Sequence, residues 1–112
     1  LNKCTYRPIW SEFCADPYLF GMVFEWHDDK FALVHQNRGI SLEEVASVFF
    51  DDCSIDKDDF ASHDEQRTLT IGMSNQARLL VVVWTQRENM IRIITAFFPT
   101  KSQEKEYANA RY

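Results

Sequence analysis

The sequence predicts a single α+β domain, and three observations support this class. Three apolar or alternating runs, at residues 67–71, 78–87 and 91–98, follow one another with only short turns between them, as in an antiparallel β-meander. Helix-capping signals begin at Ser41 and Thr100, one before and one after these runs. The chain has 112 residues, 46% of them hydrophobic, which is enough for one core and too few residues for two domains.

The first elements expected in this domain are a short strand and a helix. Residues 23–26 are mostly apolar and predict the strand. Asp28 and Asp29 place negative charge at the start of the helix, which we expect over about residues 28–36. Gly39 is suited to the left-handed conformation that often ends a helix.

A second helix is predicted directly after the capping signal at Ser41, with Glu44 completing the capping box. The apolar side chains that recur at helical spacing are Leu42, Val45, Ala46 and Phe49. One face of this helix should therefore pack on the core, and the helix should end near Phe50. The acidic residues 51–59 are expected to form a loop, with a short edge strand around residues 53–55.

Three strands and a final helix complete the prediction. Residues 67–71 alternate between apolar and polar side chains, whereas residues 79–84 are continuously apolar, as in a central strand buried on both faces. The third run forms the last strand of the meander. Thr100 and Gln103 form a second capping box, which predicts a helix that reaches about Ala110.

Residues 1–21 differ in character from the rest and are interpreted as an N-terminal extension of a domain formed by residues 22–112. The extension is rich in aromatic side chains and contains two of the three prolines. Trp10, Phe13 and Cys14 have helical spacing, so we expect the segment to dock on the domain.

Charge is distributed unevenly along the chain. The net charge is −5, which taken alone disfavours nucleic acid as a partner. Residues 22–63 carry −7, however, and residues 64–112 carry +2. This asymmetry permits a local basic site on an acidic protein.

Composition also narrows the kinds of functional site and the cellular location that we expect for this protein. Three scattered cysteines and three histidines do not form a disulfide framework or the ligand spacing of a metal site, so neither a metal nor another cofactor is expected. The sequence has no apolar run long enough to span a bilayer and no signal-peptide pattern. We therefore expect a cytoplasmic protein without a membrane partner.

Several short motifs, in their order and spacing, are similar to those of one family. The motifs are Phe24-Glu25-Trp26 with Lys30, Gly39-Ile40-Ser41-Leu42-Glu43-Glu44, His63-Asp64-Glu65-Gln66-Arg67 with Ile71-Gly72, and the strand segments 78–83 and 91–94. From Met22 to about Tyr107, the chain thereby resembles the BrnT-type toxins of bacterial type II toxin–antitoxin systems. Residues 1–21 lie outside the resemblance.

The resemblance implies a RelE-like fold: a short N-terminal strand and two helices, an antiparallel β-sheet meander and a C-terminal helix. It implies a metal-independent ribonuclease that inhibits translation. It also implies a BrnA-like antitoxin as the partner, with a ribbon-helix-helix DNA-binding domain. That antitoxin would neutralise the toxin and would connect the complex indirectly to operator DNA.

Three parts of the sequence depart from the family pattern. One is the C-terminal helix, which is often strongly basic in the family but here has Glu104 and Glu106 beside Lys101 and Lys105. The other two lie at the end of the first helix and in the last strand. Asn37 and Arg38 stand where the family usually has Lys-His, and the last strand ends in Thr95-Ala96-Phe97-Phe98 where the family usually has Ser-Ala-Arg. With the net negative charge, these departures favour a second hypothesis: a catalytically degenerate binding module that acts only through antitoxin binding and operon regulation. A third hypothesis is an unrelated structural subunit that shares only the strand pattern.

Cleavage of RNA without a metal needs a base, an acid and cations that stabilise the charged phosphorane. Arg67 is the first candidate cation, because it matches a family Arg at a strand start and its planar fork suits phosphate. A surface ion pair with Glu65 is its structural alternative. His63 is the candidate histidine base, with an ordinary exposed loop residue as the alternative. Lys30 is expected either to contact phosphate or to pair with a carboxylate.

Four further residues are candidates for substrate binding. Arg38 is expected to supply the cation that the first helix otherwise lacks, and Arg92 lies in the last strand of the meander. Lys101 and Tyr107 lie on the C-terminal helix, where they would line the site. An ordinary surface position is the alternative for each of them, and Arg78 is expected to be a solvated strand residue.

Phe97 and Phe98 are adjacent in a strand, so their side chains should point to opposite faces. One of them can enter the core, and the other should then be exposed. We hypothesise that residues 1–21 or an antitoxin segment covers the exposed ring.

Overall fold

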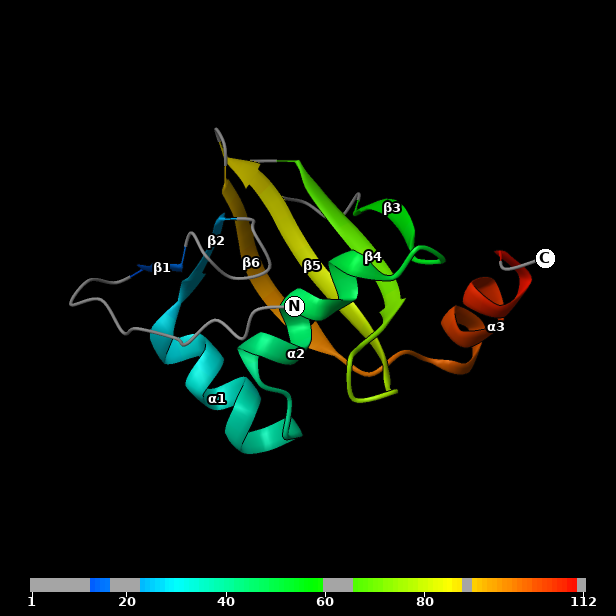
Figure 1. Cartoon of the computed structure of the whole chain (residues 1–112), viewed down its shortest axis with the longest axis horizontal. Helices are drawn as coiled ribbons and strands as arrows, with labels where there is room; N and C mark the ends of the chain where they lie inside the picture. Colours follow the sequence, from blue (N-terminus) through cyan, green and yellow to red (C-terminus); the bar gives the residue numbers. More distant parts are fainter. Residues whose placement is uncertain (1–12, 17–22, 60–65, 88–89, 111–112) are drawn as a thin grey trace.

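The computed structural model of the chain describes residues 13–16, 23–59, 66–87 and 90–110 (Figure 1). In chain order the elements are β1 (Phe13–Asp16), β2 (Val23–His27), α1 (Asp28–Arg38), α2 (Leu42–Ser47), the 3-10 helix η2 (Val48–Phe50), β3 (Ile55–Asp59), β4 (Arg67–Met73), β5 (Leu79–Arg87), β6 (Met90–Phe97) and α3 (Lys101–Ala110). This order confirms the predicted α+β class. Within the described ranges, no helix is long and apolar enough to cross a membrane.

The strands form one six-stranded sheet in the order β1-β2-β6-β5-β4-β3. The meander β4–β5–β6 is antiparallel, as predicted, and β5 lies inside the sheet. Leu80, Val81, Val82 and Val83 are buried, which confirms the predicted central strand. Strand β2 pairs with β6 in parallel. The helices and the strands β3, β4 and β5 lie between them in the sequence and provide the long connection that a parallel pair requires.

Two local predictions were wrong, both at the edges of this sheet. Residues 13–16 form strand β1, which pairs antiparallel with β2, instead of continuing a helical pattern. The acidic stretch forms strand β3 over Ile55–Asp59, later and longer than the strand expected at residues 53–55. In both places a neighbouring strand supplies backbone hydrogen bonds that a local pattern does not reveal. The exposed charges of β3 also suit an edge strand, because they disfavour further pairing.

Alternation along the strands gives the sheet two different faces. The helix-covered face packs against α1 and α2 and carries the larger core, which includes Phe24, Trp26, Leu80, Val82, Ile93 and Ala96. The opposite face carries a smaller core around Ile71, Val81 and Tyr107, against α3. In Figure 1, α1 and α2 lie together, and α3 lies apart from them beyond β4.

The predicted helix ends are largely confirmed. Gly39 ends α1 with a φ of +68°, and its N–H donates to the carbonyl of His35 (2.9 Å). The Ser41 hydroxyl accepts from the backbone N–H of Glu44 (3.1 Å). Thr100 and Gln103 cap α3 reciprocally, because each backbone N–H donates to the other residue's side chain.

The Glu44 side chain does not complete the capping box of α2 as predicted. It is 3% exposed and accepts hydrogen bonds from Arg78 Nε (2.9 Å) and Ser74 Oγ (2.7 Å), with Arg78 Nη2 on its other oxygen. Burial acts to raise the pKa of Glu44, but these hydrogen bonds and the Arg78 charge outweigh it and lower the pKa below 4.5. The hydrogen bond to Glu44 raises the pKa of Arg78. Arg78 is therefore a structural ion-pair partner and not a solvated strand residue.

Glu44→Gln should lower the free energy of unfolding at about pH 7 by roughly 1–3 kcal/mol, because the buried Ser74 hydroxyl and Arg78 lose a charged acceptor. Since folding lowers the pKa of Glu44, the stability it contributes is present above about 4.5 and is lost as the pH falls through the folded-state value. Urea denaturation at neutral and acidic pH measures both effects. Glu43→Gln, at the neighbouring half-buried position, is the control and should change stability little. A difference between Glu44→Gln and the parent that widens on acidification would contradict this account.

Gly72→Ala should also destabilise the fold, because a Cβ at this position would lie 2.8 Å from Val48 Cγ1 and 3.0 Å from Ser54 Cβ. Overpacking of this kind costs roughly 1–3 kcal/mol and should appear as a lower thermal midpoint. Val48→Ala in the same background removes the first clash. The double variant should therefore lose less stability than the two single losses predict, and full additivity would show that the contact is not the cause.

Candidate functional site

A row of charged and polar residues crosses the opposite face of the sheet. Glu25 on β2 pairs in register with Arg92 on β6, and Arg92 pairs with Thr85 on β5. The Thr85 hydroxyl donates to the carbonyl of Gln66 (2.8 Å), directly before β4, and Arg67 at the start of β4 pairs with Asp59 on β3. Two arginines therefore flank β5 in one row, and each has an acidic residue on its outer side.

The burial pattern assigns this row to the face away from α1 and α2. Phe24 and Trp26 enter the larger core, so Glu25 between them points the other way. Arg92 Nε donates to Glu25 Oε1 (2.8 Å), and both side chains are mostly buried. Arg67 alternates with Leu69 and Ile71, which belong to the smaller core of the opposite face.

The spacing of the two arginines follows from sheet geometry. Their strands are separated only by β5, and adjacent strands lie about 4.8 Å apart, so their Cα atoms are about 10 Å from each other. Arginine side chains are long enough to bridge such a gap to a shared anion. Thr85 lies between them and is buried. The row can thus offer two guanidinium groups to one phosphate backbone from a rigid sheet.

Four of the predicted residues lie outside this row. Lys30 is exposed on α1, across the sheet from Arg67. Arg38 ends α1 and donates from Nη1 to the carbonyl of Ala96 (3.2 Å). Lys101 is exposed at the first turn of α3. Tyr107 is 5% exposed and donates to Asp51 Oδ2 (2.6 Å), so its hydroxyl anchors α3.

His63 lies in the segment 60–65, outside the described residues. Among the predicted residues within the described ranges, the structure brings together only Arg67 and Arg92. Glu25, Asp59 and Thr85 belong to the same row and were not predicted as site residues. Alternation identified the face of Arg67, but no local signal revealed which strands would become its neighbours.

The adjacent phenylalanines behave as predicted. Phe97 packs against the smaller core, and Phe98 is 44% exposed. The Arg78 guanidinium lies over the Phe98 ring, 5.3 Å from its centroid, in a cation–π arrangement. Part of the exposed ring is therefore already covered from within the domain.

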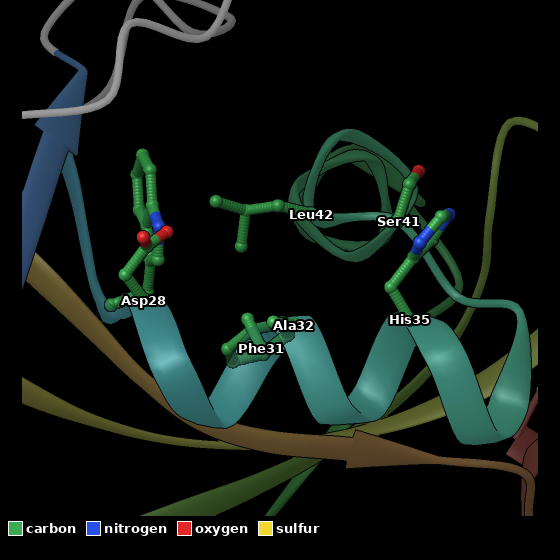
Figure 2. A pocket seen from close by; sticks show the side chains of 7 residues that line it. Asp28, Phe31, Ala32, His35, Ser41 and Leu42 are labelled. Atoms are coloured by element: carbon green, nitrogen blue, oxygen red, sulfur yellow. The ribbon is translucent and has the colours of Figure 1, made fainter.

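A separate cavity of about 270 Å³ lies between α1 and α2. It is lined by Trp26, Asp28, Phe31, Ala32, His35, Ser41 and Leu42 (Figure 2). None of the predicted site residues that the structure describes lines it. Within the described ranges, no group of three or more His, Cys, Asp or Glu side chains is arranged to hold a metal ion.

Comparison with known proteins gives one finding at the level of the family. No curated protein matches the chain significantly. A family model described as the ribonuclease toxin BrnT of type II toxin–antitoxin systems matches residues 26–102, well over half of the chain. The match includes both arginines of the row and most of the described fold. The protein therefore belongs to the BrnT family of ribonuclease toxins of type II toxin–antitoxin systems.

Proposed function

We propose that this protein is an active toxin that cleaves RNA on the opposite face of the sheet, at Arg67 and Arg92. The row that places these two guanidinium groups on either side of β5 carries the proposal. Family membership supports the reaction class. The two arginines and two acidic residues of this row sum to zero, so the net charge of −5 comes from the rest of the chain and the row is less acidic than its surroundings.

The chemistry follows from what RNA itself provides. A base removes the proton of the 2′-hydroxyl, whose oxygen attacks the adjacent phosphorus, and an acid protonates the departing 5′-oxygen. Arg67 and Arg92 would stabilise the negative charge that builds on the phosphorane oxygens. His63 is our candidate base, because it precedes Arg67 by only four residues.

The other predicted residues are assigned to peripheral contacts. Lys30 and Arg38 lie on α1, on the other side of the sheet from the row, so we propose that they bind RNA phosphates distant from the cleaved one. Lys101 begins α3 and is exposed, which suits a similar contact. Tyr107 is proposed to act indirectly by holding α3 against Asp51.

We also propose that cleavage takes place in the cytoplasm, where it inhibits translation, and that a BrnA-like ribbon-helix-helix antitoxin neutralises the toxin. Operator DNA would be reached only through that antitoxin. Family membership implies an antitoxin partner, and the type of antitoxin is the part that needs testing.

A second candidate function is a binding module without catalysis, which acts through the antitoxin and operon regulation. The observation that favours it is the pairing of Arg92 with the mostly buried Glu25, which offsets the cation before any RNA arrives. In this case the family's fold would persist for antitoxin binding alone.

Induced expression of the full chain should arrest bacterial growth, and Arg67→Ala should abolish the arrest because it removes a cation from the row. A purified protein should cleave RNA without added metal, and the variant should lose at least about tenfold in rate, since a lost charged contact costs more than 1.4 kcal/mol. Lys105→Ala, which removes an exposed cation of α3 that is not part of the row, is the matched control and should behave like the parent.

An Arg67→Ala protein that is folded and equally toxic would refute this site. If the parent is folded but causes no arrest and no cleavage, the binding module is the better account. Co-expression with a candidate ribbon-helix-helix antitoxin then tests the binding module. A binding module should co-purify with it, and Arg67→Ala should leave that binding intact.

A further inference from the structure

One end of the sheet, where β5 begins and β6 ends, carries an exposed aromatic ring among cations. Phe98 directly follows β6 and is 44% exposed. Arg38, the last residue of α1, donates from Nη1 to the carbonyl of Ala96, two residues before Phe98 (3.2 Å). Lys101 is exposed and lies three residues after Phe98, so their Cα atoms are at most about 11 Å apart. We call Arg38, Arg78, Phe98 and Lys101 the end patch; the end of β6 and the start of β5 meet in Figure 1 at the edge of the sheet from which the chain leaves for α3.

The Phe98 ring lies against a cation that the fold holds in place. The Arg78 guanidinium is over the ring, 5.3 Å from its centroid. Arg78 Nε donates to Glu44 Oε2 (2.9 Å), and Nη2 donates to the carbonyl of Gly39 (2.9 Å). The guanidinium plane is therefore fixed from two sides, and the ring is oriented against it before any ligand binds. The exposed part of the ring remains open to a second planar group.

The end patch is positively charged, in contrast to the chain as a whole. It contains three cations, and the carboxylate paired with them is the buried Glu44, which neutralises Arg78. Among the described residues, no carboxylate forms a salt bridge with Arg38 or Lys101, and this includes Glu104 one turn along α3. Two exposed cations thus stand on either side of the ring in sequence, available to an anion.

Single-stranded RNA matches this combination of groups. Its bases present flat faces that stack on aromatic side chains, and its phosphates pair with nearby cations. An acidic peptide would satisfy the cations, but its carboxylates would not use the oriented ring. A nucleotide supplies the planar group and the negative charge in one repeating unit, so the observations favour RNA over a protein segment.

We propose that the end patch binds single-stranded RNA, with an unpaired base stacked on Phe98 and phosphates at Arg38 and Lys101. This use of the patch rests on the proposed function for its ligand, RNA, but not on cleavage, because none of its residues belongs to the row of Arg67 and Arg92. It gives the substrate a second anchor. The preferred RNA should therefore have an unpaired segment away from the cleaved bond.

Fluorescence anisotropy of the full chain with a fluorescein-labelled 2′-O-methyl oligonucleotide tests the proposal. This strand lacks the attacking 2′-hydroxyl, so binding is measured without cleavage. Phe98→Ala should weaken binding on the order of tenfold, the usual size of one base–aromatic stack. Phe98→Leu keeps an apolar side chain without a ring and should lose as much, whereas Phe98→Trp should bind at least as tightly as the parent.

The matched control is Phe50→Ala, because Phe50 is 48% exposed and is not part of the end patch. It should bind like the parent. Arg78 keeps its contacts with Glu44 and Gly39 when the ring is removed, so the Phe98 variants should also unfold at the urea concentration of the parent. A loss of affinity can then be assigned to the ring and not to the fold.

An abasic strand of equal length separates stacking from charge. Phe98→Ala should leave the affinity for the abasic strand unchanged, since that strand has no base to stack. Arg38→Ala should weaken binding of both strands. It should also reduce the slope of log affinity against log salt concentration by about 0.7, the value for one phosphate contact on a single strand, whereas Phe98→Ala should leave the slope unchanged.

Several outcomes would overturn the proposal. A parent that does not bind the 2′-O-methyl strand, or a Phe98→Ala protein that binds it as the parent does, would remove the end patch as an RNA site. Equal losses on the base-bearing and abasic strands would give Phe98 a structural role instead. If Phe98→Ala retains RNA affinity but no longer co-purifies with a ribbon-helix-helix antitoxin, the ring belongs to a protein interface.

A separate cleavage assay distinguishes failure here from failure of the proposed function. A parent that binds the strand through Phe98 but cleaves no RNA would remove the proposed activity and keep the end patch. A parent that cleaves RNA, with rate and affinity unchanged in Phe98→Ala, would do the reverse.

Discussion

The buried carboxylate of Glu44 is the contact through which the helices and the sheet are joined. It belongs to α2, but its hydrogen bonds come from Ser74 and Arg78 at the β4–β5 turn. Arg78 also donates to the carbonyl of Gly39 (2.9 Å), where α1 ends. The Ser47 hydroxyl adds a second connection by accepting from the N–H of Asn75 (2.9 Å). A buried charge is costly unless it is fully paired, so the relative positions of these elements have little freedom.

Fixing both helices to one face determines what the other face can do. Strand alternation then directs Arg67 and Arg92 away from the helices, and α3 occupies the β3–β4 side of that face through Tyr107 and the Lys57–Glu106 ion pair (2.9 Å). Glu25 and Asp59 stand at the two ends of the row. Acidic neighbours of this kind hold the arginine side chains in a defined orientation, but they weaken the electrostatic attraction that the arginines offer to an anion. The proposed activity depends on the balance between these effects.

Elements whose signals lie within a few residues were predictable from the sequence. Elements that depend on pairing with a distant segment were not. Ser41, Thr100 and Gly39 act within a few residues of themselves, so the helix ends followed from the sequence. Strand β1 and the parallel pairing of β2 with β6 depend on segments far along the chain. The same reason explains the error at Glu44, whose partner Arg78 is 34 residues away. For the site, Arg67 was identified through resemblance and alternation, but its neighbours in the row were not.

The arginines show why residue type alone does not assign a role. Arg78 neutralises a nearly inaccessible carboxylate and stacks on Phe98, so its charge is largely used within the fold. Arg38 donates to a backbone carbonyl, which leaves its positive charge without a compensating carboxylate in that contact. Arg92 lies between these cases, because Glu25 retains 12% side-chain exposure. A guanidinium is available to RNA to the extent that its partner is neutral or solvated, since a desolvated ion pair screens its own charge and resists exchange. The burial of the partner, which depends on the tertiary structure, therefore separates structural arginines from those that can meet a phosphate.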